Sequence, residues 1–304
     1  MKTLILYHAA CPDGLAAAWV ARRYFGKDQV ECIPVFHGKE PPDVTDRAVY
    51  MLDFAYKPEV MEELRAKAFA LVVIDHHVTA RDDLAGQPNC YFDMNHSGCV
   101  LAWKFFFQGE DAAEEEPVPL FLQYVEDRDL FRNVLPDTEE IAAARWSYPQ
   151  TFETLDELIP ESSYEQSRVM RQLAVDGVAL LRGQRVKIEE MADNAQFFDI
   201  GGYVVPVVNA SIYFSDVAAE LYKRYPSYPF AAYYFDRGDG IRQWGLFNPN
   251  DSEFDVSTIA RLFGGGGHRH AAGFQQNIEG NNPLLLGKVC DLCAVRIAEA
   301  EQPE

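Results

Sequence analysis

The chain has 304 residues, of which 48% are hydrophobic and 24% charged, a composition typical of globular proteins that excludes broad disorder. Lys and Arg number 27 against 47 Asp and Glu, so the formal net charge is −20. We therefore expect no binding to long duplex nucleic acid, because such binding depends on Lys and Arg side chains that neutralise phosphates. Any phosphorylated substrate should be small and held by local cations.

The amino-terminal segment is interpreted as a buried strand and not as a signal peptide. His8, Pro12 and Asp13 interrupt its apolar run, and no clean small-residue cleavage site follows. No stretch approaches the roughly 18 apolar residues of a membrane span, and six Cys in a chain of this length do not predict a disulfide framework. We expect a cytoplasmic protein without membrane contact. Cys290 and Cys293 lie in a helical pattern, where structural thiols are the first interpretation and redox or metal roles the alternative.

The first half of the chain alternates short apolar runs with helical patterns. Apolar runs separated by helices are typical of a parallel sheet that is covered on both faces. Ser97 precedes one of the helical patterns and is its predicted N-cap. The predicted strands are 3–7, 48–53 and 70–75, and the predicted helices are 14–25, 58–68 and 99–107.

The second half begins with helical patterns at 117–132 and 161–195, and from about residue 198 it changes to short strands separated by turns. The predicted strands are 203–208, 230–235 and 242–247, and the predicted helices are 257–263 and 283–300. The expected fold is α/β, with a parallel-sheet domain over 1–155, a helical linker over 156–197 and a smaller α/β domain over 198–304.

Acidic and imidazole side chains follow three of the predicted strands. Because ligands gather outside the carboxyl ends of the strands in an open parallel sheet, we expect these side chains to converge. A mixed set of Asp and His suits divalent ions such as Mn²⁺. Taken singly, a strand-terminal Asp is often only a turn former, but adjacent histidines have no such explanation. The residues are His8 and Asp13 after the first strand, Asp53 after the second, and Asp75, His76 and His77 after the third.

A run of four glycines precedes two basic residues in the second half. The backbone amides of Gly265, Gly266 and Gly267 could point at one anion, and His268 and Arg269 could add charge-assisted hydrogen bonds to phosphate. A flexible linker is the alternative, but it would not lead directly into the polar and small residues that follow. The run is not a P-loop, because the Gly-Lys-Ser/Thr ending is missing.

These motifs resemble those of the DHH phosphoesterase superfamily, in the DHHA1 branch that contains RecJ exonucleases, nanoRNA-degrading enzymes and cyclic-dinucleotide phosphodiesterases. The triplet Asp75-His76-His77 corresponds to the motif that names the family, and GGGGHRHAAG at 264–273 is similar to its carboxyl-terminal signature. The motifs occur in the family's order and cover nearly the whole chain. The remaining matches are His8 and Asp13 in the first motif, Asp53 in the second and Asp127 in the fourth.

The resemblance implies metal-assisted hydrolysis of phosphate esters with two divalent ions, Mn²⁺ or Mg²⁺. Asp53 would bridge the ions, Asp75 would orient His76, and His77 would steady the non-bridging oxygens or protonate the leaving group. The implied substrates are short oligonucleotides, linear or cyclic dinucleotides, or nucleoside bisphosphates, whose far end the glycine-rich loop would hold. The other implied ligands are His8 and Cys11 for one ion, and Asp13, His76 and Asp127 for the second.

The chain departs from the family pattern in two places. Cys11 stands where the first of two acids is usual, and it could either ligate a metal as a softer thiolate or only pack beside the site. The phosphate-binding Arg expected before the glycine loop is missing from 245–248, and Arg242 is its candidate replacement. Two functional alternatives therefore stay open: a polyphosphate or pyrophosphate hydrolase, and a catalytically weak nucleotide-binding sensor. Homodimer formation is also left open.

Overall fold

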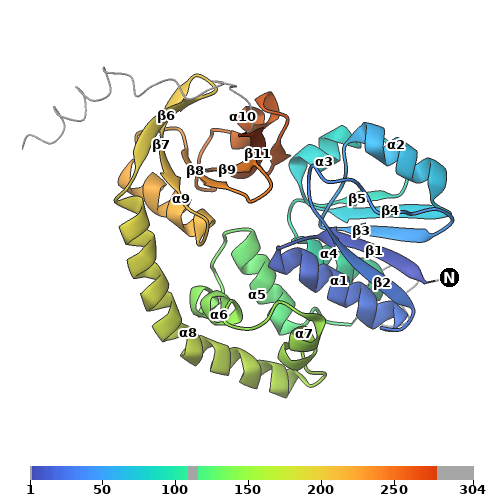
Figure 1. Ribbon diagram of the computed structural model, residues 1–304. Helices are drawn as coiled ribbons and strands as arrows, with labels where there is room; N and C mark the ends of the chain where they lie inside the picture. The colour runs from blue at the N-terminus through green and yellow to red at the C-terminus, as the bar shows by residue number, and fades with distance from the viewer. Residues whose placement is uncertain (1, 109–115, 279–304) are drawn as a thin grey trace, which may run out of the picture. The chain divides into compact units, whose positions relative to one another are not determined.

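The computed structural model describes residues 2–108 and 116–278 (Figure 1). The chain divides into two compact units, Met1–Arg182 and Gly183–Glu304, and each is described by itself. The division falls within α8 (Ser163–Ala192), a single helix of 30 residues where the sequence predicted one or two long helices. Across the described ranges, no helix combines the length and the apolar character that a membrane span requires. The predicted helix at 283–300, with Cys290 and Cys293, lies outside the described residues.

The first unit is built on a five-stranded sheet with the order β2-β1-β3-β4-β5, in which every pair of neighbouring strands is parallel. The three strands predicted from the sequence are central, and the two that the sequence did not reveal lie at the edges. One edge strand contains Pro34, a residue that a sheet tolerates mainly at its edges because it lacks an N–H. The strands are β1 (Thr3–His8), β2 (Val30–Val35), β3 (Ala48–Leu52), β4 (Ala70–Asp75) and β5 (Cys90–Phe92).

Helices cover both faces of this sheet, as Figure 1 shows, with α1 and α4 on one side and α2 and α3 on the other. Alternate strand residues point to opposite faces, so Ile5 packs in the core with α1 and α4, whereas Leu4 and Leu6 pack in the core with α2. The predicted α/β architecture with a parallel sheet is confirmed. The helices of this unit are α1 (Pro12–Phe25), α2 (Pro58–Lys67), α3 (Val78–Asp83), α4 (Gly98–Phe107), α5 (Leu120–Asp129), α6 (Thr138–Arg145) and α7 (Phe152–Leu158).

The second unit contains a six-stranded sheet with the order β10-β11-β9-β8-β7-β6. Its strand pairs are antiparallel except for β7 and β8, which are parallel. One face packs against Val256 and Ile259 of α10, and the other against Val217 and Leu221 of α9. The elements are β6 (Gln196–Ile200), β7 (Tyr203–Asn209), α9 (Phe214–Arg224), β8 (Ala231–Asp236), β9 (Ile241–Phe247), α10 (Val256–Leu262), β10 (Gly266–Gly267) and β11 (Ala271–Asn277).

Candidate metal centre

The side chains that follow β1, β3 and β4 meet at the carboxyl edge of the parallel sheet, as the sequence predicted. Asp53 lies at the centre of this group and is 1% exposed. Its Oδ1 is 3.1 Å from Nε2 of His76, and its Oδ2 is 3.4 Å from Nδ1 of His8. Burial acts to raise the pKa of Asp53, but the hydrogen bond with His76 and the nearby charges of His8 and His76 outweigh burial and hold this pKa well below its ordinary range.

Asp13 belongs both to this group and to the start of α4. Its Oδ1 accepts hydrogen bonds from Ser97 Oγ at 2.8 Å and from the Cys99 amide at 2.9 Å, and its Oδ2 accepts one from the Gly98 amide at 2.6 Å. The carboxylate thus satisfies amides that a helix start leaves without partners. Ser97 occupies the N-cap position as predicted, but its hydroxyl donates to Asp13 and does not cap the helix.

The same carboxylate faces the imidazole of the DHH triplet. Asp13 Oδ2 is 3.6 Å from Nε2 of His76. Burial, followed by the charges of Asp53 and Asp129, raises the pKa of Asp13 to about 7. For His76, burial opposes protonation, but the hydrogen bond with Asp53 and the charges of Asp129, Asp53 and Asp13 raise its pKa to about 10. In the protein without a metal, His76 is therefore protonated at neutral pH and Asp13 is partly protonated.

Two glycines allow the chain to approach the cluster closely. A Cβ atom at Gly14 would lie 2.3 Å from the backbone oxygen of His8, and one at Gly98 would lie 2.5 Å from Cβ of Asp53. Both distances are shorter than side chains tolerate, so α1 and α4 can begin where they do only with glycine at these positions. Sequence reasoning missed Gly98, because nothing in its local pattern indicates that it touches Asp53.

Asp75 holds the imidazole of His77 in place. Its Oδ1 is 2.7 Å from Nδ1 of His77 and also accepts hydrogen bonds from the backbone amides of His76, at 2.7 Å, and His77, at 3.3 Å. The ring of His76 is instead bonded to Asp53. The expected orienting role of Asp75 thus applies to the ring of His77, while His76 is anchored through its backbone.

The fourth acidic ligand predicted from the sequence, Asp127, does not join the cluster. Its carboxylate accepts hydrogen bonds from the amides of Val134 and Leu135 and from the hydroxyl of Thr138, at 3.0, 3.1 and 2.6 Å. Asp129 takes its place, with Oδ2 3.6 Å from Nε2 of His76. The two acids are two residues apart on α5, and the structure brings Asp129, not Asp127, next to His76. Which of them binds a metal stays a prediction.

Cys11 lies at the N-cap of α1, where its sulfur shares a group with ligand atoms of His8 and Asp53, all within 4.8 Å of one another. Burial, followed by the charges of Asp53, Asp129 and Asp13, raises the pKa of the Cys11 thiol well above its ordinary value. Without a cation the thiol is therefore neutral, and both roles considered for Cys11 remain predictions.

The donor atoms of the cluster fit divalent cations. Within the described part of the chain, Nδ1 of His8, Oδ2 of Asp53 and Oδ2 of Asp75 are buried and make no hydrogen bond, which is costly unless another partner binds them. Oxygen and imidazole donors of this kind suit Mn²⁺ or Mg²⁺. Three sets of ligand atoms each lie within 4.8 Å of one another: His8, Cys11 and Asp53; Asp53, Asp75, His76 and His77; and Asp13, His76 and Asp129.

The glycine run of the second unit forms a tight hairpin. A Cβ atom at Gly265 would lie 2.1 Å from the backbone oxygen of Gly273, and one at Gly267 would lie 2.7 Å from that of Ala271. Gly266 and Gly267 pair with β11, and the amides of Gly265 and His268 donate to Ala260 and Ala271. The close packing of the hairpin thus explains the glycines without a ligand, and the amide of Gly265, one of the three predicted to point at an anion, is bonded within the protein.

The two arginines predicted to bind substrate both have protein partners. Arg242 donates two hydrogen bonds to Asp236, at 2.6 and 2.8 Å, and lies 4.3 Å from the ring centroid of Tyr234. Arg269 donates to the backbone oxygen of Glu253 at 2.6 Å. The geometry therefore does not support Arg242 as a free replacement for the missing phosphate-binding residue.

No protein-family profile matches the chain. It is 28% identical over 313 residues to an uncharacterized protein of Acanthamoeba polyphaga mimivirus, covering 95% of this chain and 71% of that protein. It is 24% identical over 213 residues to an A-adding tRNA nucleotidyltransferase of Geobacter sulfurreducens, covering 69% of this chain but 22% of that protein.

Among solved structures, the DHH domain of a protein described as a member of the s1p family of ribosomal proteins is 14% identical, with a TM-score of 0.53. The similarity covers 100% of this chain and 87% of that one. With Asp75, His76 and His77 gathered at the carboxyl edge of its parallel sheet, the chain shares the fold of that DHH domain.

Proposed function

We propose that the chain is a metal-dependent phosphoesterase. The observation that carries the proposal is the convergence of His8, Asp13, Asp53, His76 and Asp129 at one sheet edge, with buried donor atoms that have no hydrogen bond. Asp53 is common to two of the donor sets, so we infer that it is the shared ligand of two divalent ions. A divalent cation held there would polarise a phosphoryl oxygen and lower the pKa of an attacking water.

His77 is the residue that we expect to transfer a proton. The hydrogen bond between its Nδ1 and Asp75 fixes the ring and leaves Nε2 as the atom that can give a proton to the leaving oxygen. Burial opposes protonation, but the charge and hydrogen bond of Asp75 raise the pKa of His77. Asp75 thus positions the acid and keeps it charged.

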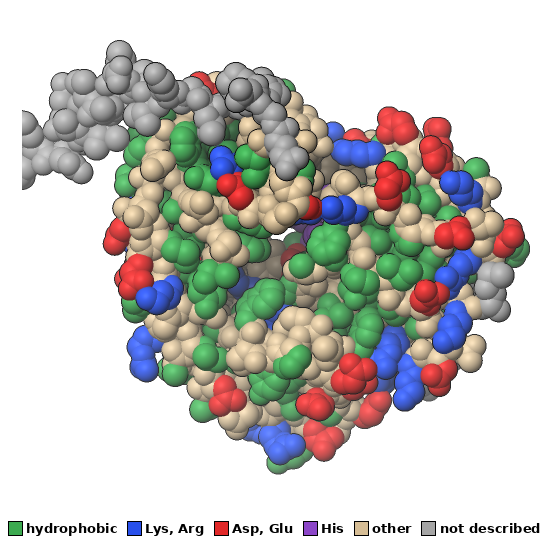
Figure 2. Space-filling view, viewed as in Figure 1, with side chains coloured by type: hydrophobic (Ala, Val, Ile, Leu, Met, Phe, Trp, Pro, Cys, Tyr) green, Lys and Arg blue, Asp and Glu red, His purple; other side chains and the backbone are tan. Residues whose placement is uncertain are grey.

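We infer that the substrates are small nucleotides or short oligonucleotides. Figure 2 shows Lys and Arg side chains among Asp and Glu along the right-hand edge of the face in view, which belongs to the first unit. Long single strands need a positive groove with stacking aromatic residues. The formal net charge of −20 adds general repulsion of long polyanions.

A substrate panel with added Mn²⁺ tests this proposal. It should contain a linear dinucleotide, a nucleoside bisphosphate, a long oligonucleotide and inorganic polyphosphate. We expect turnover of at least one of the first two compounds and much slower turnover of the long strand. Turnover of polyphosphate alone would support the phosphoanhydride alternative. Binding of dinucleotide without turnover would support a sensor, an alternative motivated by the neutral Cys11 thiol in place of a carboxylate.

A further inference from the structure

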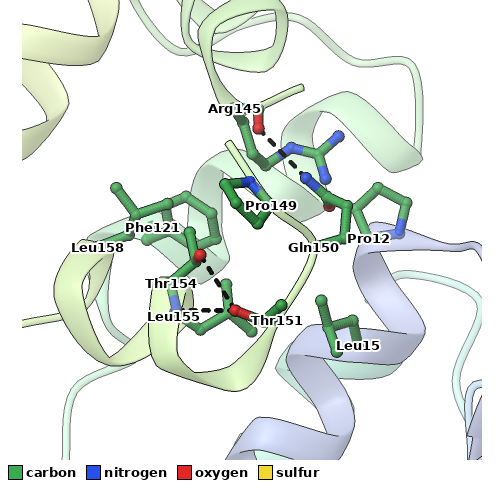
Figure 3. Close-up of a pocket in the computed structure, with 10 residues that line it drawn as sticks. All are labelled: Pro12, Leu15, Phe121, Arg145, Pro149, Gln150, Thr151, Thr154, Leu155 and Leu158. Atoms are coloured by element: carbon green, nitrogen blue, oxygen red, sulfur yellow. Dashed lines mark hydrogen bonds between the residues drawn. The ribbon is translucent and has the colours of Figure 1, made fainter. Parts of the chain in front are cut away.

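The first unit contains a pocket, shown in close-up in Figure 3. Pro12 and Leu15 of α1 form one side of it, and Phe121 of α5 and the segment 149–158 form others. Pro12 lies between Cys11 and Asp13. Both belong to the His-Asp cluster, the group of candidate metal ligands His8, Cys11, Asp13, Asp53, Asp75, His76, His77 and Asp129. The pocket and the candidate metal centre therefore both include residues at the start of α1.

The charged residue that lines the pocket is Arg145, the last residue of α6. It is only 9% exposed. Among the residues that the structure describes, no carboxylate lies within ion-pair distance of the Arg145 guanidinium. Its central carbon lies 4.7 Å from the ring centroid of Trp146. Two other partly buried arginines have carboxylate partners: Arg22 lies 3.5 Å from Asp156, and Arg47 lies 2.6 Å from Glu31.

Arg145 stays charged despite its burial, and a neighbouring side chain binds its backbone oxygen. Burial lowers its pKa to about 10, so it remains protonated near neutral pH. The side chain of Gln150 donates hydrogen bonds to the backbone oxygens of Arg145 and Tyr148, at 3.3 and 2.9 Å. Figure 3 shows the guanidinium beside Gln150 and Pro12. A buried cation without a paired anion is costly to the fold, which is typical of a residue retained for binding.

Metal binding would make an anion next to Arg145 more favourable. In the protein without metals, the negative charge of Asp129 favours the charged form of Arg145 at longer range. Divalent ions on that cluster would cancel this negative charge and leave the guanidinium uncompensated. An incoming phosphate group would then balance both the cations and the arginine.

We propose that Arg145 binds an anionic phosphoryl oxygen of the substrate beside the His-Asp cluster, from within the first unit. The inference rests on the proposed phosphoesterase function and names the cation that the glycine-loop motif did not supply. The planar guanidinium can donate two parallel hydrogen bonds to phosphate, a geometry that a Lys ammonium does not reproduce.

The test compares the full chain with Arg145→Met, Arg145→Lys and the control Arg81→Met, whose wild-type residue is an exposed arginine paired with Asp82. Calorimetric titration with inorganic phosphate, in the presence of Mg²⁺, gives the dissociation constant for each protein. We expect Arg145→Met to weaken phosphate binding by about tenfold or more, Arg145→Lys to weaken it less, and the control to match wild type. Unchanged phosphate binding in Arg145→Met would overturn the proposal.

Thermal unfolding in phosphate-free buffer separates binding from a structural role. A binding residue predicts that Arg145→Met melts at the same or a higher temperature than wild type, since an unpaired buried charge is removed. A lower melting temperature for both Arg145 variants, with phosphate affinity unchanged, would show a structural residue. Phosphate affinity lost in Arg145→Met, together with no ester turnover by wild type and Mn²⁺, would retain the anion site and reject the phosphoesterase function.

Discussion

Gly98 lies so close to Asp53 that a single added carbon at Gly98 would come within 2.5 Å of the Asp53 Cβ atom. The Gly98 amide meanwhile donates a 2.6 Å hydrogen bond to Asp13. One glycine at the first position of α4 therefore sets the spacing between two acids that lie 40 residues apart in sequence order. The metal centre depends on this packing as well as on its ligands.

Replacing Gly98 with Ala should disrupt the centre although no ligand is changed. The new methyl group must displace Asp53 or the start of α4, and such overpacking costs about 1–3 kcal/mol of unfolding free energy. We expect weaker Mn²⁺ binding by calorimetry and a lower denaturation midpoint. Gly183→Ala in α8 is the control, because a Cβ there meets no atom within 4 Å, and it should stabilise the protein by about 0.5–1 kcal/mol. Wild-type metal affinity in Gly98→Ala would contradict this account.

Neutralising Asp127 should mainly lower the stability of the fold, whereas neutralising Asp129 should mainly lower the affinity for metal. Asp127→Ala removes the acceptor of three hydrogen bonds and should destabilise the fold by about 2 kcal/mol or more. Asp129→Asn should cost little stability, because partial burial and the charge of Asp53 raise the pKa of Asp129, but it should weaken metal binding. Urea unfolding and Mn²⁺ titration of both variants measure the two effects. A loss of metal affinity confined to Asp127→Ala would restore the assignment made from the sequence.

Metal binding should release protons, and its affinity should rise with pH. At pH 7, His76, with its pKa raised to about 10, is protonated, and Asp13, with its pKa raised to about 7, is partly protonated. A cation must displace these protons, so binding weakens as the pH falls from 8 towards 6. Calorimetry in two buffers of different ionisation enthalpy counts the protons. Release of none at pH 7 would mean that neither residue binds the metal.

Cys11 can be tested by counting bound ions. We expect Cys11→Ser to keep the wild-type metal stoichiometry, because its thiol is neutral in the metal-free protein and buried thiols behave mostly as small apolar groups. Cys11→Asp should bind Mn²⁺ more tightly and, without metal, unfold more easily, since it adds a fourth acid near Asp13, Asp53 and Asp129. Elemental analysis of the purified variants gives the count. A lost ion in Cys11→Ser would make the sulfur a ligand.

The sequence predicted the central strands and the convergence of their polar ends, because apolar runs and strand-end acids are local signals. It missed β2 and β5, edge strands that are interrupted by Pro34 or only three residues long. It also selected Asp127 over Asp129, since only the direction of each side chain on α5 separates them. The roles of Gly98 and Arg145 depend on segments far apart in the sequence, so no local pattern could reveal them.

The most direct test of the phosphoesterase proposal is hydrolysis of a dinucleotide by chelator-treated protein during an Mn²⁺ titration. Wild type should be inactive without metal and reach saturation as Mn²⁺ is added. Asp53→Asn should be slower by at least about a hundredfold at every concentration, because Asp53 contacts His8 and His76. Asp43→Asn, at an exposed carboxylate bonded to Thr45, should behave as wild type. Full turnover after exhaustive chelation, or wild-type rates in Asp53→Asn, would contradict the proposed metal-dependent chemistry.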